Sequence, residues 1–238
     1  MGGTLGANPV NTAESNSFDD LRHWLADHRR VFVLTGAGCS TASGIPDYRD
    51  ERGEWKRRPP VMYQAFRNDD ATYRRYWARA FAGWPRFIAA EPSDAHRALA
   101  AWEDTGAMSQ LVTQNVDGLH QRAGSREVID LHGRLDIVIC LGCSARTSRA
   151  DAQQLIAAAN PEWRAKAVTA PDGDADIDAA LIETFAPPSC PSCGGQLKPD
   201  VVFFDENVPT ARYEQARDAL ADSSALLVAG SSLMVYSG

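Results

Sequence analysis

Residues 31–50 read VFVLTGAGCSTASGIPDYRD, and this stretch decides the fold class. The apolar run VFVL is typical of a strand that is buried on both faces of a parallel sheet. The loop that follows carries two closely spaced glycines, Gly36 and Gly38, which allow the backbone to approach a pyrophosphate. Thr41 stands where the dinucleotide-binding fingerprint has its third glycine, and we expect Ser40 or Thr41 to cap the next turn. The loop alone also fits a tight strand-to-helix turn that binds no ligand.

Short apolar runs alternate with helical patterns along the rest of the chain. We predict further strands within 110–115, 127–133, 200–204 and 225–230. Apolar residues at helical spacing predict helices that begin near Ser17, near Ala95 and near Tyr213. Strands that alternate with helices predict an α/β fold on a parallel sheet, and a stretch rich in Arg, Trp and Tyr predicts a helical insertion.

The composition is that of a globular enzyme. The length of 238 residues suffices for one sizeable core with a smaller module beside it. A net charge of −7 argues against nucleic acid as a partner, because phosphates select basic surfaces, but it is compatible with a basic peptide substrate. No apolar run approaches the roughly 18 residues of a membrane span. Residues 1–16 do not resemble a secretory signal, so we predict a disordered leader and no membrane partner. The predicted location is cytoplasmic, or mitochondrial if the protein is eukaryotic.

Four of the five cysteines form two pairs with the spacing of metal knuckles, Cys140-x2-Cys143 and Cys190-x2-Cys193. Two such knuckles supply four thiolates, which satisfy a tetrahedral zinc ion. A closed set of four thiolates leaves no open coordination position, so the predicted zinc is structural. The alternative is four reduced cysteines without a metal.

Polar side chains follow two of the predicted strands. Gln114, Asn115 and Asp117 come just after one strand, and His132 ends another. Ligands of open parallel sheets bind at the carboxyl ends of the strands, and amides with a carboxylate suit a ribose or a carboxamide. Imidazole is the natural general base near neutral pH. A polar turn and a structural histidine account for the same residues without a ligand.

Together these motifs resemble one family. GAGCSTASGIPDYRD, TQNVDGLHQRAG, LHG, the paired CxxC and LKPDVVFF occur here in the order found in the sirtuins, NAD-dependent protein deacylases. The resemblance runs from about residue 18 to the end. RYWARAFAGWP, PDGDAD and GSSLMVYSG are similar to the class II subgroup, which includes a mitochondrial sirtuin of animals and many bacterial members.

The resemblance implies a Rossmann-like sheet that binds NAD as a co-substrate. It implies these cofactor contacts: Gly36, Ala37, Gly38, Asp47, Tyr48, Arg49, Gln114, Asn115, Val116, Asp117, Gly230, Ser231 and Ser232. It assigns the catalytic roles to His132, Asn115 and Asp117, and strand pairing with an acyl-lysine peptide to Val201, Val202 and Phe203.

The mechanism that the resemblance implies is a displacement at the anomeric carbon of the nicotinamide ribose. The acyl carbonyl oxygen attacks, nicotinamide leaves, and His132 acts as general base through the ribose hydroxyls. The 2′-hydroxyl then attacks the alkylimidate, and water completes the reaction to give free lysine and O-acyl-ADP-ribose. Transfer of ADP-ribose to another nucleophile by a mono-ADP-ribosyltransferase, and non-catalytic binding of NAD or zinc, remain alternatives.

Several residues depart from the family pattern or extend it. Cys39 replaces an aliphatic residue, and Asp205 stands where the family has a glycine, which puts peptide clamping in question. Tyr76 and Arg79 match a Tyr-x-x-Arg pair that grips acidic acyl groups, although a packed tyrosine beside a solvated arginine fits equally well. Family members continue with another strand–helix–strand unit toward the adenosine, so we expect this sequence to be a fragment.

These observations predict the following division of the chain, in a protein that we expect to be a monomer. A Rossmann-like domain comprises 17–52, 106–135 and 199–238, a helical insertion with its flanking helix comprises 53–105, and a zinc-binding module comprises 136–198.

Overall fold

A four-stranded parallel sheet organises one half of the molecule. The computed structural model describes residues 18–47, 60–165 and 177–234. The strands are β1 (Val31–Thr35), β2 (Met108–Thr113), β3 (Val128–Asp130) and β7 (Ala225–Ala229). They lie in the order β3-β2-β1-β7, and each pair is parallel. The α/β class predicted from the sequence is confirmed.

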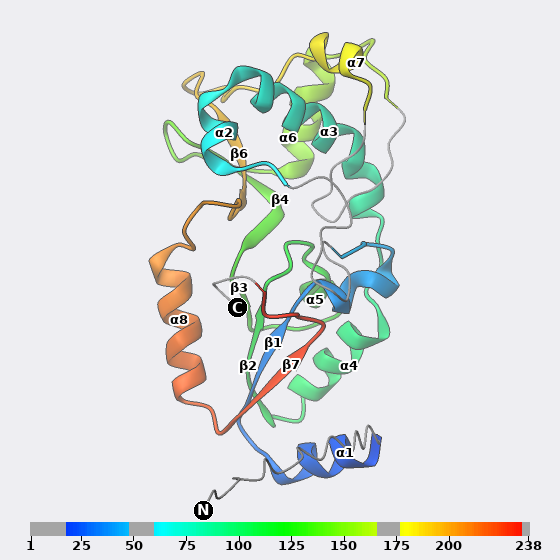
Figure 1. Cartoon of the computed structure of the whole chain (residues 1–238), viewed down its shortest axis with the longest axis vertical. Coiled ribbons are helices and arrows are strands. Elements are labelled where there is room, and N and C mark those ends of the chain that lie inside the picture. The colour runs from blue at the N-terminus through cyan, green and yellow to red at the C-terminus, as the bar shows by residue number, and fades with distance from the viewer. Residues whose placement is uncertain (1–17, 48–59, 166–176, 235–238) are drawn as a thin grey trace, which may run out of the picture.

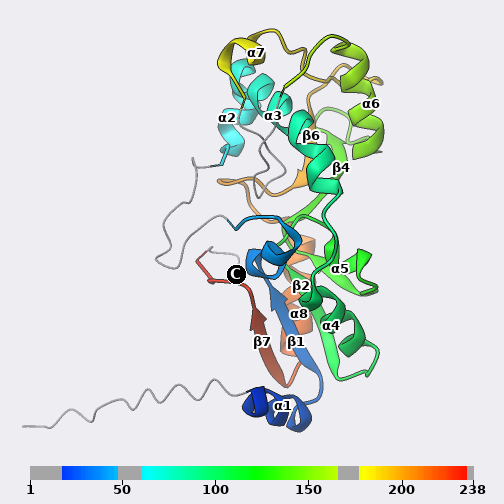
Figure 2. The same ribbon diagram turned by 90° about the vertical axis from the view of Figure 1, so that its right-hand side faces the viewer.

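Helices cover both faces of this sheet, which explains why VFVL is apolar throughout (Figures 1 and 2). The elements around it are α1 (Phe18–Asp27), the 3₁₀ helix η1 (Ala37–Ser43), α4 (Asp94–Glu103), α5 (Leu119–Arg122) and α8 (Thr210–Ala221). Val31 and Val33 pack with Leu99 of α4, whereas Phe32 and Leu34 pack with Ala216 of α8. We call this half the sheet lobe.

In the part of the chain that the structure describes, the second half, the small lobe, holds an antiparallel sheet and four helices. Its strands are β4 (Gly133–Cys140), β5 (Arg146–Ser148) and β6 (Leu197–Val201), in the order β5-β4-β6. Its helices are α2 (Tyr63–Asn68), α3 (Asp70–Ile88), α6 (Arg149–Ala159) and α7 (Ala179–Glu183). Figure 1 shows these elements above the carboxyl ends of β1 and β2.

The run at 200–204 is the main correction to the predicted topology. We expected it in the parallel sheet, but β6 pairs antiparallel with β4, with Val201 opposite Gly133 and Leu197 opposite Cys140. A Cβ on Gly133 would lie 1.9 Å from the carbonyl oxygen of Asp200, so the two backbones need a glycine there. Apolar runs do not reveal the direction of their partner. The predicted boundaries at 135/136 and 198/199 consequently fall inside β4 and β6, and the domain division stays a prediction.

The helical insertion and the cysteine-bearing segment share one aromatic core. The Tyr73 hydroxyl of α3 donates to Pro188 O at 2.8 Å and accepts from Leu197 N at 2.9 Å. Trp77 Nε1 donates to Leu197 O at 3.1 Å. The two segments that the sequence separates therefore form a single lobe. Among the described residues, no helix is long and apolar enough to cross a membrane.

Candidate active site

Two glycine-bearing loops meet at the carboxyl edge of the parallel sheet. Gly38 N donates to Gly230 O at 2.8 Å, and a Cβ on Gly36 would lie 2.8 Å from the same oxygen. Gly230 has a φ of +64°, and a Cβ there would lie 2.4 Å from Cys39 N. Only glycine permits this close approach of the two loops. The structure thus brings two predicted cofactor segments together.

Asn115 and Asp117 are tied to the first glycine loop by hydrogen bonds. Asn115 Nδ2 donates to Gly36 O and to Ser40 Oγ, both at 3.0 Å. Ser40 Oγ in turn donates to Asp117 Oδ2 at 2.6 Å. The expected capping by Ser40 or Thr41 is wrong: Gly36 occupies the N-cap of η1, and Thr41 Oγ1 donates back to Gly38 O. Ser40 lies inside η1, and its hydroxyl donates to the carboxylate of Asp117, which is a strong acceptor.

Beneath this network lie two buried histidines to which the sequence analysis gave no role. Thr35 Oγ1 donates to Thr113 Oγ1, so His120 Nε2 donates to Thr35 Oγ1 at 2.8 Å. Ser93 N donates to His96 Nδ1 at 3.1 Å, which turns His96 Nε2 toward Ser40 Oγ at 3.5 Å. Burial lowers the pKa of His96 and lowers that of His120 to about 3. Neutral imidazoles therefore support the floor of the site.

His132 lies at the end of β3, where the chain turns into β4. Its Nδ1 donates to Gln114 O at 3.0 Å, because a carbonyl can only accept. This bond places the proton on Nδ1 and the lone pair on Nε2 when the ring is neutral. Burial lowers the pKa of His132, while the bond to Gln114 O opposes that shift. The side chain is thus prepared to accept a proton near neutral pH.

The side chain of Gln114 connects the second glycine loop to the site. Ser231 Oγ donates to Gln114 Oε1 at 2.6 Å. Within the described residues, Gln114 Nε2 is buried without a hydrogen-bond partner. A buried unpaired donor is costly, and it suits a site that receives an acceptor atom of a ligand. Together with the two glycine-bearing loops, this donor fits the carboxamide or ribose of a nucleotide.

Most of the remaining predicted cofactor residues lie near the carboxyl edge of the parallel sheet. Ala37 and Asp47 are half-buried near η1, Val116 packs against the core of the small lobe, and Ser232 is exposed. Tyr48 and Arg49 lie outside the described residues.

The predicted substrate strand touches the predicted base. Val202 N donates to His132 O at 2.8 Å. The Phe203 ring lies 5.2 Å from that of Tyr76, and Tyr76 is buried among aromatic side chains of α2 and α3. Arg79 is half-buried one turn further along α3. Binding of an acidic acyl group by this pair stays a prediction.

Asp205 adopts the backbone conformation that the family pattern reserves for glycine. Its φ is +64°, in the left-handed region that aspartate tolerates better than most residues. Asp205 Oδ1 accepts from Tyr63 N at 2.6 Å, and Tyr63 N also donates to Phe204 O at 2.9 Å. The side chain therefore joins the turn to α2, and the turn keeps its glycine-like shape.

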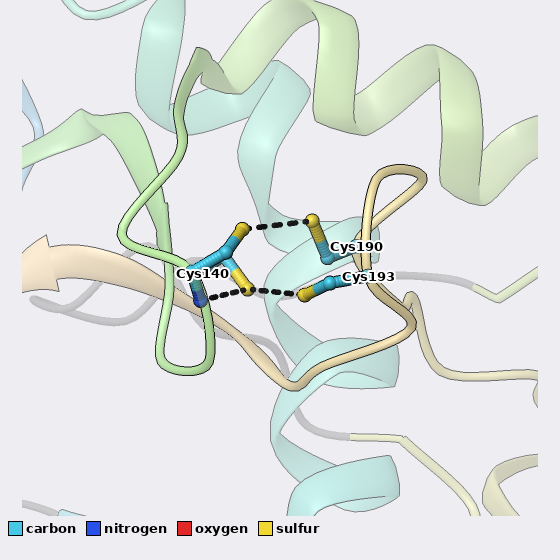
Figure 3. A group of neighbouring side chains, drawn as sticks. Cys140, Cys190 and Cys193 are labelled. Atoms are coloured by element: carbon cyan, nitrogen blue, oxygen red, sulfur yellow. Dashed lines mark hydrogen bonds between the residues drawn. The ribbon is translucent and has the colours of Figure 1, made fainter.

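The four paired cysteines converge in the small lobe on two facing loops (Figure 3). Their Sγ atoms all lie within 4.8 Å of one another. The Cys140–Cys193 and Cys143–Cys190 sulfur distances are 3.5 and 3.8 Å, too long for disulfides. A tetrahedron with Zn–S bonds of about 2.3 Å has edges of about 3.8 Å. The cluster therefore fits one structural zinc ion, as the sequence predicted.

Comparison with known proteins identifies the family. The model of the Sir2 family matches residues 36–237, which is most of the chain. This chain belongs to the Sir2 family.

Its relatives include proteins from bacteria and from animals. This Sir2-family chain is 58% identical over 219 residues to NAD-dependent protein deacetylase 2 of Bradyrhizobium diazoefficiens, covering 92% of this chain and 80% of that protein. It is 45% identical over 223 residues to the human mitochondrial NAD-dependent protein lipoamidase sirtuin-4. That alignment covers 92% of this chain and 71% of the human protein. A solved Sir2 structure with a p53 peptide and NAD+ superposes on this chain with a TM-score of 0.69 at 30% identity. The superposition covers 92% of this chain and 78% of that one.

The sirtuin motifs thus locate the carboxyl edge of the sheet but not the side chains beneath it. His96 could have been noticed from the spacing Ser93-x-x-His96, which places a ring nitrogen over the start of α4 as in a capping box. His120 carries no comparable local signal, because its hydrogen-bond partner Thr35 lies on a strand 85 residues earlier in the chain.

Proposed function

We propose that this chain is an NAD-dependent protein lysine deacylase that transfers the acyl group to ADP-ribose and releases nicotinamide. The observation that carries the proposal is His132, whose Nδ1–H is fixed on Gln114 O, while Asn115 and Asp117 of the same loop after β2 are hydrogen-bonded to the glycine loop. Family membership and relatives named NAD-dependent protein deacetylases support it.

NAD, when bound, supplies an anomeric carbon from which nicotinamide can be displaced by the carbonyl oxygen of an acyl-lysine. The two glycine-bearing loops, which lie against each other at the carboxyl edge of the sheet, would receive its phosphates. Gln114 Nε2 and Asn115 orient the nicotinamide ribose and carboxamide. Asp117, held by Ser40 Oγ and by Leu119 N, would place a carboxyl group beside that ribose.

His132 Nε2 accepts a proton from a ribose hydroxyl in this proposal, and the resulting positive charge is shared with Gln114 O through Nδ1–H. General-base catalysis of this kind contributes about 10²–10⁴-fold in rate. Burial lowers the pKa of His132, so the ring is neutral at physiological pH and can accept a proton.

The acyl peptide pairs with residues 201–203 as an added strand. Two contacts hold this segment beside His132: Val202 N donates to His132 O, and the Phe203 ring lies next to that of Tyr76. Solved Sir2 structures hold a p53 peptide with NAD+ or a propionylated peptide. The monomeric state and the cytoplasmic location predicted from the sequence remain part of the proposal.

Nicotinamide release from NAD tests the function, measured with acetyl-, lipoyl- and glutaryl-lysine peptides. We expect release that depends on an acyl peptide and falls at least about 100-fold in His132→Ala. His28→Ala, which removes an imidazole from the end of α1, is the matched control and should retain the activity. Release without an acyl peptide would instead indicate ADP-ribosyl transfer or NAD hydrolysis, and no release would indicate a binding protein.

A further inference from the structure

A buried lysine lies directly behind the segment proposed to receive the peptide. The Lys198 side chain is only 4% exposed, although lysine is among the residues least often buried. It lies on β6, three residues before the end of that strand. Neither the cofactor network nor the cysteine cluster uses it.

The ammonium group of Lys198 joins both ends of residues 201–206. Its Nζ donates to Val201 O at 2.5 Å and to Glu206 Oε2 at 2.8 Å. Glu206 Oε2 also accepts from Phe203 N at 2.8 Å, and Glu206 N donates to Phe203 O at 3.1 Å. The carboxylate and the ammonium together fix the backbone at Val201, at Phe203 and at the turn that follows.

Aromatic rings enclose the same charge. Lys198 Nζ lies 4.9 Å from the ring centre of Phe203 and 5.6 Å from that of Tyr63. Tyr63 N donates to Phe204 O, so the start of α2 is attached to the same turn. Burial lowers the pKa of Lys198, and the carboxylate of Glu206 opposes that shift.

A buried ion pair is a poor way to gain stability, because the cost of desolvating two charges offsets much of their attraction. What this pair does supply is geometry: its hydrogen bonds specify the backbone conformation of one short segment. That segment is the one which the proposed function assigns to peptide binding.

We propose that Lys198 is a positioning residue that holds residues 201–206 in the shape that receives the acyl-lysine peptide. The inference rests on the proposed function for the identity of the ligand. Without the ammonium, Val201 O and Glu206 lose the cation that joins them, although Phe203 N still donates to Glu206. The segment must then be ordered when the peptide binds.

The test compares Lys198→Met, Lys198→Arg and Glu206→Gln with the wild type. We measure binding of a fluorescent acetyl-lysine peptide by anisotropy, and KM and kcat for peptide and for NAD. Arg149→Met is the matched control, since Arg149 is a similarly buried cation, 4.9 Å from the ring centre of Trp84 and 5.1 Å from that of Trp77. Zinc content and thermal unfolding report on folding.

We expect the peptide Kd and KM to rise about tenfold in Lys198→Met and in Glu206→Gln, which corresponds to ordering one or two side chains on binding. The kcat and the KM for NAD should stay within about twofold of the wild-type values. Lys198 would affect peptide binding equally in the ground state and the transition state, and such a change leaves kcat unaltered. Lys198→Arg should recover most of the loss. Arg149→Met should lower the unfolding temperature without changing peptide affinity.

An unchanged peptide Kd and KM in folded Lys198→Met would overturn the inference, and so would an equal rise in Arg149→Met. If Lys198→Met does not fold, Glu206→Gln decides by the same criteria. Failure of the proposed function has a different signature: wild-type protein would then release no nicotinamide with any acyl peptide. The anisotropy measurement would still decide the role of Lys198, and wild type that binds no peptide would overturn both.

Discussion

The sheet lobe and the small lobe build the two sides of one site by different means. At the edge of the parallel sheet, backbone atoms and buried polar side chains are connected by short hydrogen bonds among Gly36, Ser40, Asn115 and Asp117. The small lobe instead packs aromatic rings around α3 and gathers four thiols in a separate cluster. In the proposed function, the first arrangement positions polar atoms for chemistry, and the second shapes a surface for a peptide. Stability and function are therefore expected to respond differently to changes in each lobe.

Loss of the metal should have the largest effect and should be confined to the small lobe. Cys190→Ser removes one of four ligands, and structural zinc contributes about 10–16 kcal/mol in isolated zinc-finger peptides. We expect loss of zinc and rapid hydrogen exchange in the small lobe, while β1 and β2 remain protected by their own core. Metal analysis and hydrogen-exchange mass spectrometry measure both.

Cys39→Ser is the control for that change, because Cys39 lies on the glycine loop and outside the cluster. It should retain one zinc ion per chain. Equal loss of protection in both lobes of Cys190→Ser would show that the two cores do not unfold separately.

Gly36→Ala should have the next largest effect and should act on the sheet lobe. The new Cβ would lie 2.8 Å from Gly230 O and from Ser231, so the loops must separate, at a cost of about 1–3 kcal/mol. We expect NAD affinity to fall at least about tenfold in a calorimetric titration.

Gly44→Ala distinguishes the effect of separating the two loops from the effect of backbone strain alone. Gly44 has a φ of +82° with nothing within 4 Å of its would-be Cβ, so its substitution strains the backbone by about 1 kcal/mol without separating the loops. Its NAD affinity should match the wild type. A similar loss of affinity in both variants would contradict the role given to the loop contact.

His120 should make the sheet lobe sensitive to acid. Burial lowers its pKa to about 3 from 6.5, so the unfolded state binds the proton first as the pH falls. The free energy of unfolding should then decrease below pH 6.5 by up to about 1.4 kcal/mol per pH unit from this group. His120→Gln keeps a donor for Thr35 but cannot titrate, and should show a correspondingly smaller slope in denaturant titrations between pH 6.5 and 5. Equal slopes would contradict the buried neutral state.

The smallest effect expected is a displacement of the pH profile. Burial lowers the pKa of His132 below 6.5, so kcat/KM for the acyl peptide should fall in acid with a midpoint below pH 6.5. A midpoint above 6.5 would indicate that another group provides the base.

The sequence predicted the parts of this fold that depend on local pattern. VFVL reads as a buried strand because residues 31 to 34 alternate between two helix-covered faces, and the CxxC pairs predict their cluster because metal knuckles have a fixed spacing. Gln114 and Asn115 were located because β2 ends at Thr113.

What the sequence did not predict depends on partners distant in the chain. β6 pairs antiparallel with β4, whose first residue, Gly133, lies 64 residues before β6 begins at Leu197. The hydrogen bonding of the buried His120 depends on Thr35. The buried charge of Lys198 has a partner only because the turn after β6 places Glu206 beside it. None of these contacts leaves a periodic signal.

The fate of the acyl group tests the central claim most directly. After incubation with NAD and an acetyl-lysine peptide, mass spectrometry of the products should find free lysine peptide and O-acetyl-ADP-ribose in equal amounts, both absent in His132→Ala. ADP-ribose attached to protein, with the peptide still acetylated, would contradict the account.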